Sequence, residues 1–123
     1  MVINKLLHAG LLVEDTLRSL EFYQGVLGLE MDSSRPELGY PGAWLWVGLQ
    51  QIHLMELSNP DPAEGRPVHG GRDRHLALTV SDIEALRRAF EKSGVVYTWS
   101  KSGRRALFCR DPDGNALEFI EQN

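Results

Sequence analysis

The sequence has little of the material on which several large classes of protein depend. It contains one cysteine, Cys109, which excludes an internal disulfide framework and fits a reducing compartment. No apolar run approaches the roughly 20 residues that cross a bilayer, and the first residues lack the basic and apolar regions of a signal peptide. The net charge is −4, so the basic surplus of a nucleic-acid or anionic-membrane binder is also missing. We therefore expect a cytoplasmic protein with no nucleic-acid or membrane partner.

What is present is the composition of an ordinary globular domain. Hydrophobic residues make up 42% and charged residues 24% of the 123 residues. A chain of this length can bury a core without disulfides or structural metals, and its length indicates a single domain over 1–123. Four histidines stand out in a chain that otherwise has few chemically distinctive residues.

The chain contains an internal repeat. Segment 8–15 matches segment 75–82 in its histidine, valine and aspartate at an offset of 67 residues, and later segments match at offsets of 66 and 65. Such repeats mark supersecondary units that bury their apolar faces together. We predict an α+β fold of two tandem βαβββ modules: module 1 over about 1–60, a linker rich in proline and glycine over about 58–74, and module 2 over about 74–123.

Both modules predict the same order of elements, with a sheet of four strands in each. In the first we expect a strand over 5–13, a helix over 15–27, and strands over 29–33, 43–48 and 51–57. In the second we expect a strand over 75–80, a helix over 82–92, and strands over 95–99, 105–110 and 115–121. Asp15 and the box Ser81-Asp82-Ile83-Glu84 are the predicted helix starts. Gly28 and Gly94 stand where helices end, and Asp111-Pro-Asp-Gly114 predicts a type I turn.

The repeat brings four ionisable residues to equivalent positions. His8 and His75 stand near the start of the first strand of each module, and His53 and Glu118 stand in the last strand between aliphatic residues. Neighbours in a strand point to opposite faces, and an ionisable group on a buried face is costly unless it is paired or coordinated. If a pseudo-twofold axis relates the modules, the four side chains converge. Imidazoles with one carboxylate predict a site for Fe(II), Mn, Ni, Co or Zn.

Five segments together carry a family resemblance. They are His8-Ala-Gly-Leu-Leu-Val-Glu-Asp, Ser19-Leu-Glu-Phe-Tyr-Gln-Gly-Val-Leu-Gly-Leu, Gly42-Ala-Trp-Leu, His75-Leu-Ala-Leu-Thr-Val and Asp111-Pro-Asp-Gly-Asn-Ala-Leu-Glu-Phe. The chain resembles the vicinal oxygen chelate superfamily, which includes glyoxalase I, type I extradiol dioxygenases, methylmalonyl-CoA epimerase, fosfomycin-resistance thiol transferases and bleomycin-binding proteins. The resemblance implies two βαβββ modules, often in a domain-swapped homodimer whose metal sites lie between modules.

The resemblance implies that His8, His75 and Glu118 are metal ligands. The family's fourth ligand, usually Glu or Gln, falls on His53 in one register and on Glu56 in another. These two residues are three positions apart, so they cannot both face the cavity of a regular strand. The pairing of His53 with Glu118 in the internal repeat favours His53.

The leading functional hypothesis is a divalent-metal-dependent, glyoxalase I-like enzyme, a lyase or isomerase of the lactoylglutathione lyase type, for a small substrate with vicinal oxygens. The resemblance implies a metal acting as Lewis acid on an oxyanion, with Glu118 as both ligand and catalytic base. One alternative is a small Fe(II)-dependent ring-cleaving dioxygenase. Another is a metal-free small-molecule binding protein of the bleomycin-resistance kind, a class that normally lacks the ligand set.

Clues to the substrate are few. Trp44, Trp46 and Phe108 alternate along strands, and either wall the cavity or join the core. Two basic clusters indicate an anionic substrate or thiol conjugate, unless they are solvated loops: Arg66, Arg72, Arg74, Lys101, Arg104 and Arg105. Cys109 is expected to be a buried structural thiol, and His69, in the loop, receives no role beyond a substrate contact.

Overall fold

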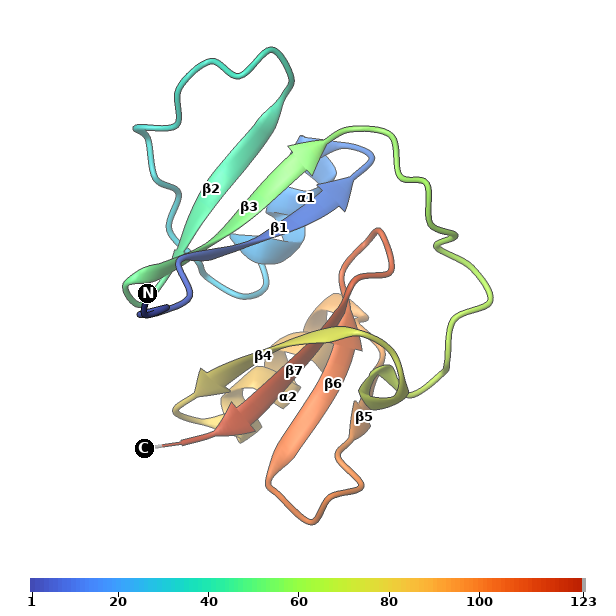
Figure 1. Cartoon of the computed structure of the whole chain (residues 1–123). Coiled ribbons are helices and arrows are strands. Elements are labelled where there is room, and N and C mark those ends of the chain that lie inside the picture. The colour runs from blue at the N-terminus through green and yellow to red at the C-terminus, as the bar shows by residue number, and fades with distance from the viewer. Residues whose placement is uncertain (123) are drawn as a thin grey trace. The chain divides into compact units, whose positions relative to one another are not determined.

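The computed structural model describes residues 1–122 and shows a mixed α+β fold. The chain forms two compact units, Met1–Asn59 and Pro60–Asn123, each with its own sheet and helix (Figure 1). The predicted α+β class is confirmed, and the order of strand, helix and further strands recurs in both units. Among the described residues, no helix is both long and apolar enough to cross a membrane.

The first unit has a three-stranded sheet. Its elements are β1 (His8–Val13), α1 (Thr16–Tyr23), β2 (Gly42–Val47) and β3 (Gln50–Glu56). The strand order is β1-β3-β2, with β1 parallel and β2 antiparallel to β3. Residues of β3 therefore have a neighbouring strand on either side, which puts His53 in the middle of the sheet.

The strand predicted over 29–33 is reduced to an isolated bridge between Met31 and Leu45. The amide of Asp32 still donates a backbone hydrogen bond to β2 at 2.8 Å. The extended segment ends there because the Asp32 carboxylate accepts hydrogen bonds from the amide and hydroxyl of Ser34, at 2.9 and 2.7 Å, which turns the chain. The expectation of four strands is therefore wrong for this unit.

The second unit has the four-stranded sheet that its sequence predicts, in the order β4-β7-β6-β5. Its elements are a short 3₁₀ turn η1 (Gly70–Arg72), β4 (His75–Val80), α2 (Ile83–Ser93), β5 (Tyr97–Trp99), β6 (Ala106–Arg110) and β7 (Ala116–Glu121). β4 runs parallel to β7, whereas β6 is antiparallel to both β7 and β5. The predicted turn between β6 and β7 is confirmed, since Gly114 N donates to Asp111 O at 3.0 Å.

Both helices begin in the same way. Asp15 and Asp82 are the N-caps, and each carboxylate accepts hydrogen bonds from the amides two and three residues further on. The first amide of each helix donates instead to a carboxylate from the last strand of its unit, Glu56 at 2.8 Å and Glu121 at 3.0 Å. The box that was expected to start at Ser81 does not form, because the cap is Asp82.

The two helices end differently. α2 ends at Gly94, which has a φ of 72° and is the glycine terminator that the sequence predicts. α1 ends at Tyr23, before the predicted end at residue 27, because the amide of Gly25 bonds to Leu20 O, five residues back, at 3.2 Å. Turns then continue to Gly28, where φ is 71°.

Each unit has its core on one face of its sheet. Tyr23 of α1 and Leu45 of β2 are 0% exposed in the first unit. Phe90 of α2 and Leu107 of β6 are likewise 0% exposed in the second unit. Because side chains alternate along a strand, the residues between these core positions point to the face opposite the helix. That opposite face carries the candidate ligands in both units.

Candidate functional site

In the second unit, His75 of β4 and Glu118 of β7 form a close pair. His75 Nε2 lies 3.2 Å from Glu118 Oε1, and Glu118 is only 3% exposed. On the other side of the ring, Nδ1 lies 2.9 Å from the carbonyl oxygen of Asp73. A carbonyl only accepts, so Nδ1 carries a proton and Nε2 is the nitrogen that faces the carboxylate. A lone pair facing a carboxylate is favourable only with a proton or a cation between them.

The geometry of this pair fits a metal. Two ligand atoms about 2.1 Å from one ion, at octahedral or tetrahedral angles, lie about 3.0–3.4 Å apart. The 3.2 Å between His75 Nε2 and Glu118 Oε1 falls in that interval. The Nδ1–H···O=C contact is also the outer-shell hydrogen bond that metal-binding histidines commonly make.

In the first unit, His8 of β1 and His53 of β3 are stacked. Their ring centroids are 3.8 Å apart with an interplanar angle of 11°. The Trp44 ring stacks on His53 at 4.3 Å and 8°, so it covers the other face of that imidazole. Imidazole nitrogens bind a metal in the ring plane, and two parallel planes at this spacing cannot both contain one ion. One ring has to turn before His8 and His53 share a metal.

His53 is also held at its edge. Its Nε2 lies 2.7 Å from Gln51 Oε1, and Gln51 Nε2 donates to Asp32 Oδ2 at 2.8 Å. Because the Gln51 amide nitrogen is engaged, its oxygen faces His53 and accepts the Nε2 proton, which leaves the lone pair on Nδ1. Burial lowers the pKa of His53, and the neighbouring charges of His8 and then Arg35 lower it further.

The strand ladders show that the two pairs are equivalent. His8 lies opposite Gln51, two residues before His53, and His75 lies opposite Ala116, two residues before Glu118. The aromatic side chains repeat as well. Trp44 lies opposite His53, as Phe108 lies opposite Glu118. The correspondence found in the sequence is therefore a correspondence of register and of sheet face.

Glu56, the other candidate for the fourth position, has a different partner. It alternates with His53 onto the helix-facing side of β3, where Oε1 accepts the amide proton of Thr16 at 2.8 Å. Its counterpart Glu121 accepts the amide proton of Ile83 in the same way at 3.0 Å. Both carboxylates anchor the first turn of a helix.

His69 also lies on the Glu118 face of the second sheet. Its Nδ1 is 2.7 Å from the Thr98 hydroxyl, and its ring meets Phe108 edge-on at 4.7 Å. Thr98, Phe108 and Glu118 are cross-strand neighbours in one row of the ladder. Sequence reasoning missed this position because a loop residue has no periodicity to assign it to a face. Its separation of six residues from His75 was the only signal.

The basic residues are mostly neutralised. Of the six singled out in the sequence, four pair with carboxylates: Arg66 with Asp73, Arg74 with Asp61, Arg105 with Glu121, and Arg104 with Glu118. Arg104 Nη2 lies 3.2 Å from Glu118 Oε2, so one basic side chain reaches the candidate ligands. Trp44, Trp46 and Phe108 lie on the ligand face rather than in the helix-packed core.

Cys109 is buried, as expected of a structural thiol. Burial raises its pKa to about 12, with a further contribution from the charge of Asp111. The thiol therefore has little thiolate character at neutral pH.

Each unit by itself supplies two candidate ligands. Among residues 1–122, no three His, Cys, Asp or Glu side chains gather within a unit as a metal-binding group. The donor types are those of a first-row divalent site, three imidazoles and one carboxylate.

Each unit has a strand, a helix and further strands, and its candidate ligands lie on the sheet face opposite the helix. This arrangement is the one that the family resemblance implies. The sequence model of the Glyoxalase/Bleomycin resistance protein/Dioxygenase superfamily matches residues 5–119, and the chain belongs to this family. The family identified from the five sequence motifs is thereby confirmed.

Among curated proteins, the chain is 36% identical to lactoylglutathione lyase of Haemophilus influenzae, over 95% of this chain and 92% of that one. It is 34% identical to lactoylglutathione lyase of Salmonella typhimurium, over 95% and 92% of the two chains. These relatives support a glyoxalase-type protein.

Solved structures show the same fold. A provisionally named glyoxalase family protein from Bacillus anthracis matches with a TM-score of 0.82 at 23% identity, over 100% of this chain and 98% of that one. The fosfomycin resistance protein FosX of Listeria monocytogenes matches with a TM-score of 0.77 at 19% identity, over 99% and 94%. A further FosX structure contains Mn(II), so this fold holds a divalent metal in at least one relative.

Proposed function

We propose that the protein is a divalent-metal-dependent, glyoxalase I-like enzyme that acts on a small substrate with two neighbouring oxygens. The observation that carries the proposal is the His75–Glu118 pair, whose nitrogen and oxygen are 3.2 Å apart while the other ring nitrogen of His75 donates to the carbonyl of Asp73. The identity to relatives named lactoylglutathione lyase supports the same activity.

In this proposal His8, His53, His75 and Glu118 hold the ion, which is Zn, Ni, Mn, Co or Fe. The bound metal supplies Lewis acidity that stabilises negative charge on the substrate oxygens. His53 is preferred to Glu56, because Glu56 accepts a helix amide on the opposite face of the strand. Since each unit offers two ligands, a four-ligand site takes one pair from each kind of unit; the homodimer that the family resemblance implies is the proposed assembly.

Glu118 is the proposed catalytic base. Glu118 is 3% exposed, and among the described residues its second oxygen, Oε2, contacts Arg104 Nη2 at 3.2 Å. One oxygen binds the metal in this scheme, and the other receives a proton from the substrate carbon once Arg104 turns away.

The proposed substrate is anionic or a thiol conjugate. Arg104 reaches the Glu118 carboxylate and is half exposed, so it can turn toward a negatively charged group. Trp44 and Phe108 supply aromatic surface beside the ligands. A glutathione hemithioacetal combines negative charge with two neighbouring oxygens, and it is the substrate to test first.

The test loads the purified protein with each metal, counts bound metal by elemental analysis, and measures isomerisation of the methylglyoxal–glutathione hemithioacetal. We expect about one bound ion per site. We also expect that Glu118→Gln abolishes the activity and that Glu121→Gln retains it. A protein that takes up no divalent metal would overturn the proposal. Oxygen consumption with Fe(II) and catechols would favour the alternative of a dioxygenase. Ligand binding that survives His75→Ala would favour the alternative of a metal-free binding protein.

A further inference from the structure

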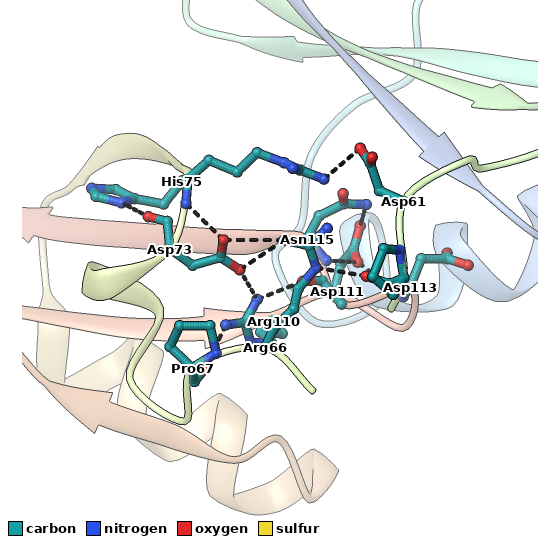
Figure 2. A network of polar contacts seen from close by, with 12 residues as sticks. Asp61, Arg66, Pro67, Asp73, His75, Arg110, Asp111, Asp113 and Asn115 are labelled. Atoms are coloured by element: carbon teal, nitrogen blue, oxygen red, sulfur yellow. Dashed lines mark hydrogen bonds and ion pairs between the residues drawn. The ribbon is translucent and has the colours of Figure 1, made fainter. Parts of the chain in front are cut away.

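The Asp73 carboxylate, two residues before His75, is held by two arginines. Arg66 Nη1 donates to Oδ1 at 3.1 Å, and Arg110 Nη1 donates to Oδ2 at 2.9 Å (Figure 2). The side chains of Asp73, Arg66 and Arg110 are 11%, 17% and 23% exposed. Ion pairs this shielded hold their geometry better than surface pairs do.

Both arginines also bind backbone carbonyls. Arg110 donates to Gly114 O and Pro67 O, each at 2.7 Å, and Arg66 Nε donates to Pro62 O at 2.8 Å. The planar guanidinium can make several such contacts at fixed angles, which a lysine cannot do. The arginines therefore tie the connecting segment 60–74 to the turn between β6 and β7, with Asp73 at the centre (Figure 2).

What this cluster fixes is the backbone at Asp73, whose carbonyl oxygen accepts the proton of His75 Nδ1 at 2.9 Å. That hydrogen bond orients the ring, and it leaves Nε2, which faces Glu118 at 3.2 Å, as the nitrogen for an ion. The candidate ligand of the first unit differs, because the His8 ring makes no hydrogen bond among the described residues and only stacks on His53.

We infer that Arg66, Asp73 and Arg110 are positioning residues for His75: they hold the Asp73 carbonyl so that His75 offers Nε2, already oriented, to the ion. This inference rests on the proposed function for its metal readout, but the orientation of the His75 ring in the metal-free protein does not depend on it. The three residues form an outer shell around the ligand. The connecting segment is in this sense part of the site.

The first experiment follows the hydrogen bond between His75 Nδ1 and the Asp73 carbonyl by NMR of the ¹⁵N-labelled, metal-free protein. In the unsubstituted chain we expect an Nδ1 proton that the hydrogen bond protects from exchange with water. In Arg110→Met we expect this proton to exchange faster, while the His53 signals stay unchanged. Arg105→Met is the matched control, because it removes an arginine–carboxylate pair from the same unit without touching Asp73. An Nδ1–H signal that Arg110→Met leaves unaltered, in a folded variant, would overturn the inference.

The second experiment titrates Ni²⁺ and Zn²⁺ into the same variants. Outer-shell substitutions commonly weaken metal binding by about 10–100-fold, and we expect that loss for Arg110→Met and less than about 2-fold for Arg105→Met. If Arg110→Met does not fold, Arg66→Met and Asp73→Asn serve, since both spare the Arg110 contacts to backbone carbonyls. Equal affinities for all folded variants would overturn the inference. A chain that binds no metal, but in which Arg110→Met speeds exchange of the His75 Nδ1 proton, keeps the inference and rejects the proposed function.

Discussion

In the second unit the candidate ligands are a histidine and a carboxylate 3.2 Å apart, whereas in the first they are two imidazoles stacked at 3.8 Å. The ladder positions are equivalent, so the difference comes from the side chains and their surroundings. In the second unit a backbone carbonyl and two arginines orient His75. In the first unit the His8 ring makes no described hydrogen bond, and its stacked geometry does not suit a shared ion.

The comparison distinguishes the position of a candidate ligand in its sheet from the preorganisation of its side chain. A repeat conserves which face and which register a residue occupies, because both follow from backbone alternation and pairing. The preorganisation of His75 comes from contacts with the connecting segment, which lies outside the repeat. The arginine cluster involves the connecting segment before β4, and the corresponding segment before β1 makes no such cluster in the described chain. We therefore interpret the second unit as the half-site that is already formed, and the first as the one that rearranges.

The largest expected effect is the loss of the only carboxylate among the four proposed ligands. Glu118→Gln removes the negative charge from the formed pair and is expected to weaken Ni²⁺ and Zn²⁺ binding by more than about 100-fold, beyond the usual outer-shell range. His53→Gln loses a neutral ligand and keeps an amide oxygen, so about 10-fold is expected. Competition titration measures both, with Glu121→Gln as the control in the same strand. Equal losses would contradict the proposed difference between the units.

The next effect concerns how closely the backbone approaches each ligand face. A Cβ on Gly71 would lie 2.7 Å from His69 Nε2 and 3.1 Å from Cζ of the buried Phe108. Gly71→Ala is therefore expected to destabilise the protein by about 1–3 kcal/mol. A Cβ on Gly10 would meet only the flexible end of Met55 at 3.1 Å. Gly10→Ala should stay within about 0.5 kcal/mol.

Chemical denaturation of the two variants measures this difference. It also shows which ligand face is tightly packed. A Gly10→Ala variant as unstable as Gly71→Ala would mean that the faces are equally crowded, and the proposed freedom of the first unit to rearrange would be lost.

A smaller effect tests the assignment of Glu56. Glu56→Ala and Glu121→Ala each remove a carboxylate that accepts the first amide of a helix, and each is expected to cost about 1 kcal/mol. Because both carboxylates lie on the helix-facing side, neither variant should change metal affinity by more than about 2-fold. Thermal unfolding and the Ni²⁺ titration check the two statements. A large loss of affinity in Glu56→Ala alone would make Glu56 a ligand and exclude His53 from that role.

Much of the fold and of the site follows from local pattern. The strand faces were predictable because Ile52 and Leu54 flank His53 as Leu117 and Phe119 flank Glu118, and alternation then assigns the faces. The pairing of His53 with Glu118 needed only the offset of the repeat. These features depend on neighbours in the chain, which a sequence displays directly.

The features that escaped prediction depend on contacts between distant residues. The segment around Met31 has the residues of a strand, but the hydrogen bonds from Ser34 to Asp32 end it after a single bridge. The role of Asp73 depends on Arg110, 37 residues later. Nothing in the local pattern of either residue distinguishes this pair from a solvated one.

The smallest expected effect is on the titration of the first unit in the metal-free protein. Burial lowers the pKa of His53 below its ordinary 6.5, and the charge of His8 contributes next. Since the folded-state pKa is lowered, the unfolded chain binds more protons just below pH 6.5, and stability falls as the pH drops through this window. His8→Gln removes one cause and leaves burial and the charge of Arg35, so the His53 pKa should rise partway. An NMR titration of the His53 ring measures it. An unchanged His53 pKa would mean that the stacked rings are not electrostatically coupled.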